Sequence, residues 1–309
     1  MNISKVRGGS YMASNLFYIR CDNCGAEYRI NSRGEMNCPF CGSKIYLNDQ
    51  DFKEYLKTRD EMLIKDRVDN DLVNSTGDVI HKWNNESSAL LYAENGTPVD
   101  IKYFYQYDRP GKTVYVCREK VAIVYDNKLA AHSVINTIQQ LQYPSADIKN
   151  LAQFFPELKF IMQLKDDKCL LVINKPENVY PLALFDKLDP KQVAWMISRM
   201  ENFGCLLEYN ALDTDKLEKL DLYINPKTHH MYLLGGWEYI QPKFAFDNYF
   251  LKNVRTIAKD LMYLDRAPQK CIDFLNSKPE IDAYSDFKAW DDVIEYGFSG
   301  HNFHPFTED

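Results

Sequence analysis

The chain has 309 residues, 45% of them hydrophobic and 14% aromatic, which is enough for one large domain or roughly two smaller ones. Its formal net charge of -7 argues against attraction to nucleic acid or an anionic membrane and favours proteins or small ligands. No apolar run approaches the ~20 residues that span a bilayer, and Met1–Arg7 lacks the apolar core of a signal peptide. We therefore expect a cytoplasmic protein with no membrane insertion.

Four of the eight cysteines are clustered near the N-terminus in two knuckles of identical spacing. Two residues separate the cysteines of each knuckle, so both thiolates can face one ion, and the glycine that follows permits a turn that points backbone N–H groups at sulfur. Four thiolates at this spacing favour tetrahedral zinc. The predicted ligands are Cys21, Cys24, Cys38 and Cys41.

Short β-favouring runs flank these knuckles at Phe17–Arg20, Glu27–Ile30 and Lys44–Leu47. The segment from Asn15 to Asn48 resembles a zinc ribbon. A four-cysteine site has no open position for a water molecule, so we expect the metal to stabilise a small module and not to catalyse a reaction. A redox role for the CxxC pairs and iron in place of zinc remain the alternatives.

A charged segment follows the knuckles. Asp49–Asp71 combines an imperfect apolar stripe with opposite charges at helical spacing, which predicts a solvated connecting helix. Asn70–Asn85 is rich in turn residues and is predicted to be a linker.

From Ser88 the pattern predicts strands, then a helix, then two further strands. The turn residues Asn95-Gly96 and Arg109-Pro110-Gly111-Lys112 separate the first strands into an antiparallel meander. The predicted strands are Ala89–Tyr92, Val99–Tyr105, Thr113–Cys117, Val121–Tyr125, Leu158–Leu164 and Lys168–Ile173, with the helix at His132–Leu141.

The remainder is predicted to be mainly helical. Pro190–Leu207 has an apolar face, and Asp189 before Pro190 is a suitable N-cap. Cys271 is of the type found in protein cores. Further helices are predicted at Val254–Leu264, Pro268–Asn276 and Asp286–Ile294.

One stretch within this half has a distinctive layout. After the first long helix, a polar loop leads to the runs Leu222–Ile224 and Met231–Leu234, which are separated by turn residues and followed by Gly235-Gly236. Helix, loop, short hairpin and small-residue exit resemble the catalytic and metal-binding loops of the protein-kinase fold. The strand and helix order of Ser88–Phe306 is similar to that fold, with Asn174–Asn178 at its hinge.

The resemblance implies that the catalytic residues have been lost. It places Asp221 where the family has a metal-binding Asn, and Lys216 at the catalytic aspartate with Asp215 beside it. Gly235-Gly236-Trp237 stands where the family has Asp-Phe-Gly. Because glycine has no side chain to bind magnesium, the metal would lose its main ligand.

The small lobe is expected to lack its nucleotide-binding groups as well. The resemblance places Val124 at the position of the strand lysine and offers Gln139 and Gln140 in place of the helix glutamate. A phosphate-covering loop should be rich in glycine, but the candidate turns hold only Gly96 or Gly111. Lys112 and Lys120 could meet a phosphate, although solvated lysines beside turns are the simpler interpretation.

These observations predict an α+β protein with a small zinc ribbon (1–48), a charged helical linker (49–87), a β-rich small lobe (88–174) and a helical large lobe (175–309). The predicted function is that of a non-catalytic, zinc-binding, pseudokinase-like adapter or regulator that binds another protein. One alternative is a divergent nucleotide-dependent phosphotransferase whose metal carboxylates would come from Asp213, Asp215, Glu218 or Asp221.

A second alternative is a nucleic-acid adapter that uses basic residues in and near the ribbon. The acidic residues Asp22, Glu27 and Glu35 offset that charge, so a protein partner is favoured. The basic candidates are Lys5, Arg7, Arg20, Arg29, Arg33 and Lys44.

Overall fold

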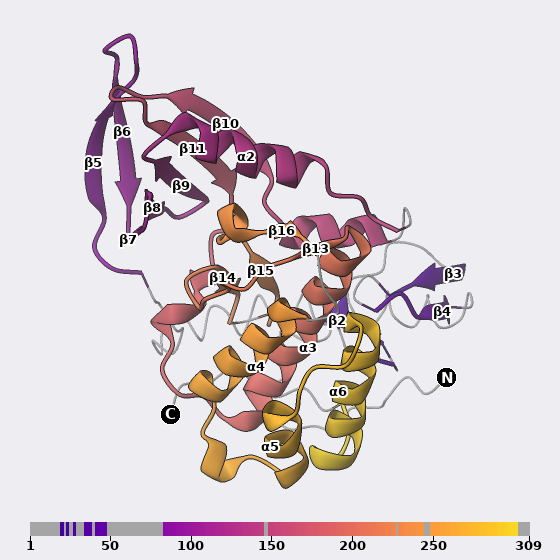
Figure 1. Cartoon of the computed structure of the whole chain (residues 1–309). Coiled ribbons are helices and arrows are strands. Elements are labelled where there is room, and N and C mark those ends of the chain that lie inside the picture. Colours follow the sequence, from indigo (N-terminus) through magenta and orange to yellow (C-terminus); the bar gives the residue numbers. More distant parts are fainter. Residues whose placement is uncertain are drawn as a thin grey trace, which may run out of the picture. The chain divides into compact units, whose positions relative to one another are not determined.

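A computed structural model describes residues 19–21, 23–24, 27–28, 34–38, 41–47, 83–144, 148–226, 228–243 and 248–301 (Figure 1). The chain divides into two compact units. The first contains the four N-terminal strands, and the second contains the elements from Ser87 to Gly297, apart from residues 145–150. The predicted connecting helix at Asp49–Asp71 lies outside the described residues.

The first unit consists of two antiparallel strand pairs. β1 (Ile19–Arg20) pairs with β2 (Glu27–Tyr28), and β3 (Gly34–Asn37) pairs with β4 (Lys44–Leu47). Three of these strands lie within predicted runs. β3 was not predicted, because Gly-Glu-Met-Asn has little β-propensity and forms a strand through pairing with β4.

The second unit begins with a β-rich small lobe built on a five-stranded antiparallel sheet in the order β10-β11-β9-β8-β7. A helix, α2, connects the third of these strands to the fourth along the chain, as predicted. The strands are β7 (Tyr105–Arg109), β8 (Lys112–Val116), β9 (Lys120–Tyr125), β10 (Leu158–Gln163) and β11 (Cys169–Asn174).

A separate hairpin packs against one face of this sheet. β5 (Ser87–Tyr92) pairs with β6 (Pro98–Tyr103), and Ile101 of β6 joins a core cluster that includes Val124 and Val172 of the sheet. The predicted meander was therefore wrong in its first part. The run predicted as Val99–Tyr105 is two strands that belong to different sheets and are separated by the buried residue Phe104.

The helix α2 (Lys128–Gln139) packs against β9 and β11. It begins four residues before the predicted start, because the Asn127 side chain accepts a hydrogen bond from Ala130 N at 2.9 Å and caps the helix. Its buried residues are Ala131, Val134 and Ile138.

The large lobe is built around α3 (Pro190–Tyr209), which confirms the predicted helix. Asp189 accepts from Lys191 N and forms a capping box with Gln192, while Pro190 occupies the first turn. Most of this helix is buried because α4 (Tyr249–Leu261) and α6 (Ala283–Gly297) pack against it.

Three further helices confirm the remaining predictions with shifted bounds: α4 (Tyr249–Leu261), α5 (Gln269–Asn276) and α6 (Ala283–Gly297). A buried bidentate ion pair joins α4 to α6, with Arg255 nitrogens 2.7 and 2.8 Å from Asp286 oxygens. Cys271 is buried, as predicted.

Several short strands lie between the small lobe and the long helices of the large lobe (Figure 1). β14 (Leu222–Ile224) and β15 (Met231–Leu233) form the predicted hairpin. The remaining short elements are η2 (Ile148–Phe154), β12 (Tyr180–Pro181), η3 (Leu182–Leu184), β13 (Leu212–Asp213), η4 (Trp237–Tyr239), β16 (Gln241–Pro242) and η5 (Leu264–Arg266).

The predicted hinge at Asn174–Asn178 connects the two lobes. The Lys175 ammonium is buried there and donates to the backbone oxygens of Arg118, Pro176 and Val179 at 2.7 to 2.9 Å. It also lies 4.7 Å from the ring centre of Trp83. None of the described helices is both long and apolar enough to cross a membrane.

Candidate functional site

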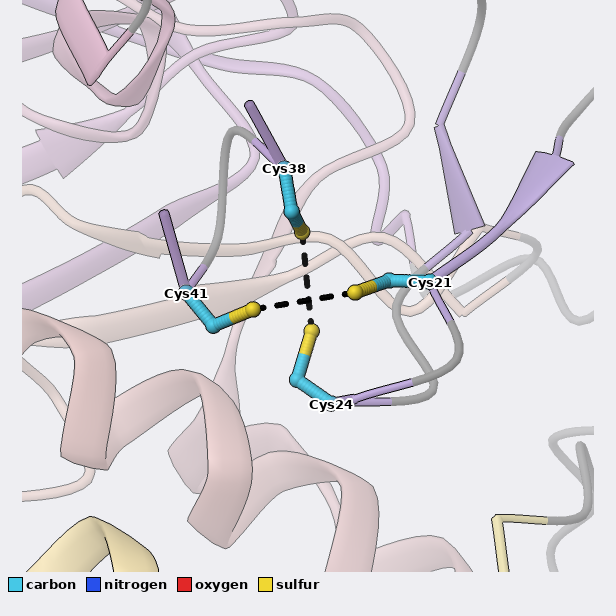
Figure 2. Close-up of side chains that lie close together, drawn as sticks. All are labelled: Cys21, Cys24, Cys38 and Cys41. Carbon is cyan, nitrogen blue, oxygen red and sulfur yellow. Dashed lines mark hydrogen bonds between the residues drawn. The ribbon is translucent and has the colours of Figure 1, made fainter. Parts of the chain in front are cut away.

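The four predicted cysteines converge on one point in the first unit (Figure 2). Their sulfur atoms all lie within 4.8 Å of one another. The Sγ atoms of Cys21 and Cys41 are 3.6 Å apart, as are those of Cys24 and Cys38. Each close pair therefore joins one knuckle to the other.

These distances fit a tetrahedral metal site. Zn–S bonds of about 2.3 Å give tetrahedral S···S separations of about 3.8 Å, whereas a disulfide bond would be about 2.0 Å long. All four cysteines are free thiols, and three of them are buried. Four sulfur ligands can hold one zinc ion and leave no position for a reacting water molecule.

The second knuckle shows how the chain turns around the site. Gly42 has a φ of 72° and donates to the Cys38 carbonyl at 2.9 Å, while Cys38 N donates to Ser43 O at 2.7 Å. Glycine suits this left-handed conformation. Burial raises the pKa of Cys38, whereas hydrogen bonds from neighbouring thiols lower the pKa of Cys41.

A second group of functional candidates lies in the cleft between the lobes of the second unit. Lys112 at the start of β8 has a side chain that is only 2% exposed, and its Nζ is 2.6 Å from Glu238 Oε1 of η4. The interpretation of Lys112 as a solvated lysine was therefore wrong. Glu238 was not among the predicted residues.

Arg109, at the other end of the same turn, forms a second ion pair across the cleft. Its guanidinium lies 2.5 Å from Asp221 Oδ1 and 2.9 Å from Glu218 Oε1, and it packs over the Tyr239 ring. The side chains of Arg109 and Asp221 are 6% and 1% exposed. Burial opposes the charge of Arg109, but the carboxylates of Asp221 and Glu218 raise its pKa above the ordinary value.

Tyrosine hydroxyl groups add a third connection between the lobes. Tyr107 of β7 donates to Leu220 O at 3.0 Å, and its hydroxyl is 3.1 Å from that of Tyr223. Burial raises the pKa of both tyrosines, so they remain protonated near neutral pH.

The side chains that meet here fill the cleft. Lys112 and Tyr125 of the small lobe meet Trp237 and Glu238 of the large lobe, and the space that they line has no room for a water molecule. A small-molecule pocket ordinarily has about 300–1,000 Å³ of space. The space lined by these residues therefore has no room for a nucleotide in this structure.

The double glycine after β15 is explained by Asp221. A Cβ atom at Gly235 would lie 2.7 Å from Asp221 Oδ1 and 2.8 Å from its backbone Cα, and a Cβ at Gly236 would lie 2.9 Å from Asp221 Cγ. Gly236 also has a φ of 75°. The position expected for a metal-binding aspartate thus has no space for any side chain.

The other carboxylates proposed for a catalytic metal do not converge. Asp213 is buried and accepts from the backbone N–H groups of Tyr249 and Phe250, so it serves the start of α4. Asp215 is exposed, and Asp221 and Glu218 pair with Arg109. Within the described residues, the grouping that could hold a metal is the four-cysteine cluster.

Two positions that the resemblance singles out in the small lobe lie away from the cleft. Val124 belongs to the core cluster beneath the β5–β6 hairpin, whereas Ile123 and Tyr125 line the cleft on the face that contacts α2. A side chain that pairs with the helix must lie on the face of Ile123 and Tyr125. Gln139 and Gln140 are exposed at the end of α2 and are not among the residues that line the cleft.

The basic residues proposed for nucleic acid are described only in part. Lys44 is exposed and lies 2.6 Å from Glu35, so its charge is already paired. Lys5, Arg7, Arg29 and Arg33 lie outside the described residues.

The strand order, the helix after the third strand and the helical second lobe have the arrangement that the sequence resemblance implies. The fold is mixed α+β, with a β-rich part followed by a helical part. The structure of vaccinia related kinase 3 is similar, with a TM-score of 0.47, 11% identity and coverage of 71% of this chain and 93% of that chain. The BubR1 kinase domain matches with a TM-score of 0.48, 8% identity and coverage of 74% and 91%. No protein-family model and no curated protein matches the sequence.

Proposed function

We propose that this protein is a zinc-binding, pseudokinase-like adapter that acts by binding another protein and not by phosphoryl transfer. The observation that supports this function best is the closed cleft, in which Arg109 pairs with Asp221 and Lys112 pairs with Glu238. Both cationic side chains come from the turn that would otherwise cover nucleotide phosphates.

The chemistry of phosphoryl transfer gives the first reason. It requires a carboxylate to orient the attacking hydroxyl group and carboxylate or amide ligands for magnesium. Lys216 at the expected carboxylate position has the wrong charge and packs over the Tyr239 ring. Gly235 provides no ligand, and Asp221 occupies the space beside it.

The cost of opening gives the second reason. A nucleotide would have to separate two ion pairs whose cations are almost fully buried. Breaking a buried pair costs about 3–5 kcal/mol when one charge is left without its partner. Phosphate groups could replace the carboxylates as partners of Arg109 and Lys112, but Asp221 and Glu238 would then be left in an anionic site.

The ribbon surface favours a protein over a polyanion as the partner. Glu35 lies directly opposite Tyr46 in the β3–β4 pairing, and Lys44 neutralises Glu35. Tyr46 is 63% exposed. Exposed tyrosine with paired charges of both signs is suited to protein contact, because phosphate binding needs unpaired cations.

A capture experiment tests the partner. Full-length protein and its Tyr46→Ala variant would serve as baits in extract of the native host, with Tyr284→Ala as the matched control because Tyr284 is 70% exposed on α6. We expect a protein that wild type and the control retain and that Tyr46→Ala loses. Retention unaffected by Tyr46→Ala would contradict a role for this face, and nuclease-sensitive retention would favour the nucleic-acid alternative.

An activity measurement tests the alternative of a divergent phosphotransferase. We expect no transfer of the ATP γ-phosphate to the protein itself or to general protein substrates, with magnesium or manganese. Transfer that the Asp221→Ala variant abolishes would support the phosphotransferase instead.

A further inference from the structure

The four-cysteine cluster has one corner that differs from the others. Cys41 is partly exposed, whereas Cys21, Cys24 and Cys38 are buried. Two polar side chains approach its sulfur. Asn23 Nδ2 donates to Cys41 Sγ at 3.6 Å, and the Cys41 thiol donates to Ser43 Oγ at 3.1 Å, a contact in which the hydroxyl group becomes the donor once the thiol is deprotonated.

These two side chains come from different parts of the site. Asn23 belongs to the first knuckle, between Cys21 and Cys24, and Ser43 follows Cys41 in the second. The Asn23 amide therefore connects the knuckles independently of the metal. Ser43 is also fixed by its backbone, because its carbonyl accepts from Cys38 N at 2.7 Å.

Charge explains why such donors matter. Four thiolates around a divalent ion leave a net charge of about -2, most of it on sulfur. Water cannot reach the buried sulfur atoms, so their negative charge is stabilised best where protein hydrogen-bond donors contact the cluster. An amide N–H and a hydroxyl group both donate to a thiolate, and hydrogen bonds to ligands commonly change metal affinity by about 10- to 100-fold.

We propose that Asn23 and Ser43 are positioning residues that hold the Cys41 thiolate on the metal, so that zinc retention is decided at this corner. The inference rests on the proposed metal centre and deepens it. Both residues act through Cys41 and do not bind the ion themselves. Loss of either donor leaves four ligands in place but makes the Cys41 ligand easier to displace.

Competition with a chromophoric chelator on the full-length protein measures the zinc Kd. We expect Asn23→Ala and Ser43→Ala each to weaken binding about 10-fold or more, within the range for hydrogen bonds to metal ligands. Asn23→Asp should weaken it further, because it replaces a donor with a negative charge at equal size. Ser43→Thr keeps the hydroxyl group and should bind zinc like wild type. Glu35→Gln on β3 is the control and should also bind zinc like wild type.

Cobalt substitution supplies a readout that general loss of structure would not move in the same way. Loss of a hydrogen bond to sulfur should shift the sulfur-to-cobalt charge-transfer band of Asn23→Ala and Ser43→Ala to lower energy, with tetrahedral d–d bands retained. Zinc Kd values within twofold of wild type and unshifted bands would overturn the inference alone. A wild-type protein that holds no metal would overturn the metal centre as well.

Discussion

The ion pair between Arg109 and Asp221 should be the strongest single electrostatic contact between the lobes. Asp221→Asn removes the charge of a side chain that is 1% exposed and leaves Arg109 with only the largely exposed Glu218. Arg109→Met leaves Asp221 buried with the Glu218 backbone N–H as a donor. Because breaking a buried pair costs about 3–5 kcal/mol, each single variant should lose about 3 kcal/mol of unfolding free energy.

The double variant separates this pairing from general damage. With both charges absent, neither side chain is left as an unpaired ion in the cleft. The double variant should therefore lose about 2 kcal/mol less unfolding free energy than the sum of the two single variants. The exposed pair of Arg118 and Glu177, with side chains 47% and 50% exposed, is the control and should couple by less than about 1 kcal/mol.

Urea unfolding followed by tryptophan fluorescence is the suitable assay. All four tryptophans, Trp83, Trp195, Trp237 and Trp290, belong to the second unit, so the signal reports on that unit alone. The idea that this pair closes the cleft would be refuted if each single variant lost less than about 1 kcal/mol of unfolding free energy. It would also be refuted if the loss in the double variant equalled the sum of the single losses to within about 0.5 kcal/mol.

Three further outcomes are expected. Burial, together with the Asp286 charge, raises the pKa of Glu201 above 4.5, so the protonated side chain stabilises the fold fully below that pH and this contribution is lost as pH rises to the folded pKa. In urea titrations, the unfolding free energy of Glu201→Gln should therefore increase relative to that of wild type as pH rises, by at most about 1.4 kcal/mol per pH unit. Gly235→Asp should lower the unfolding midpoint and give no magnesium-dependent thermal shift, because its Cβ would meet Asp221. Metal analysis should find about one zinc per chain in the wild-type protein and none in Cys24→Ser, while the tryptophan-monitored midpoint stays unchanged.

The four-cysteine cluster was predictable because its information is local. Cys21, Cys24, Cys38 and Cys41 are spaced as knuckles, and that spacing alone brings the sulfurs of each pair to one side of the chain. The helix α3 was equally predictable, since Asp189 and Pro190 mark its start and the apolar spacing continues through it.

The cleft was not predictable from local patterns. Arg109 and Asp221 are 112 residues apart, and neither sits in a motif that names the other. The sequence shows that Gly235 has no side chain to bind a metal, but the steric reason for a glycine there appears only once Asp221 is placed beside it.

The orientation of β9 was beyond sequence reasoning for a different reason. Val121–Tyr125 is apolar throughout because the β5–β6 hairpin covers one face of the strand and α2 lies against the other. A run that is apolar at every position has no alternation to show which face Val124 takes. The sequence of the β5–β6 hairpin likewise does not show that these two strands form a sheet separate from the five-stranded one.

Titration calorimetry of the purified, zinc-loaded protein with ATP and magnesium tests the closed cleft most directly. Stabilisation of about 2.7 kcal/mol is expected for any ligand at 100 times its Kd, so a parallel thermal-shift series provides an independent reading. We predict no heat of binding and no shift at millimolar ATP. Magnesium-dependent binding that the Asp221→Ala variant loses would contradict both the closed cleft and the proposed function.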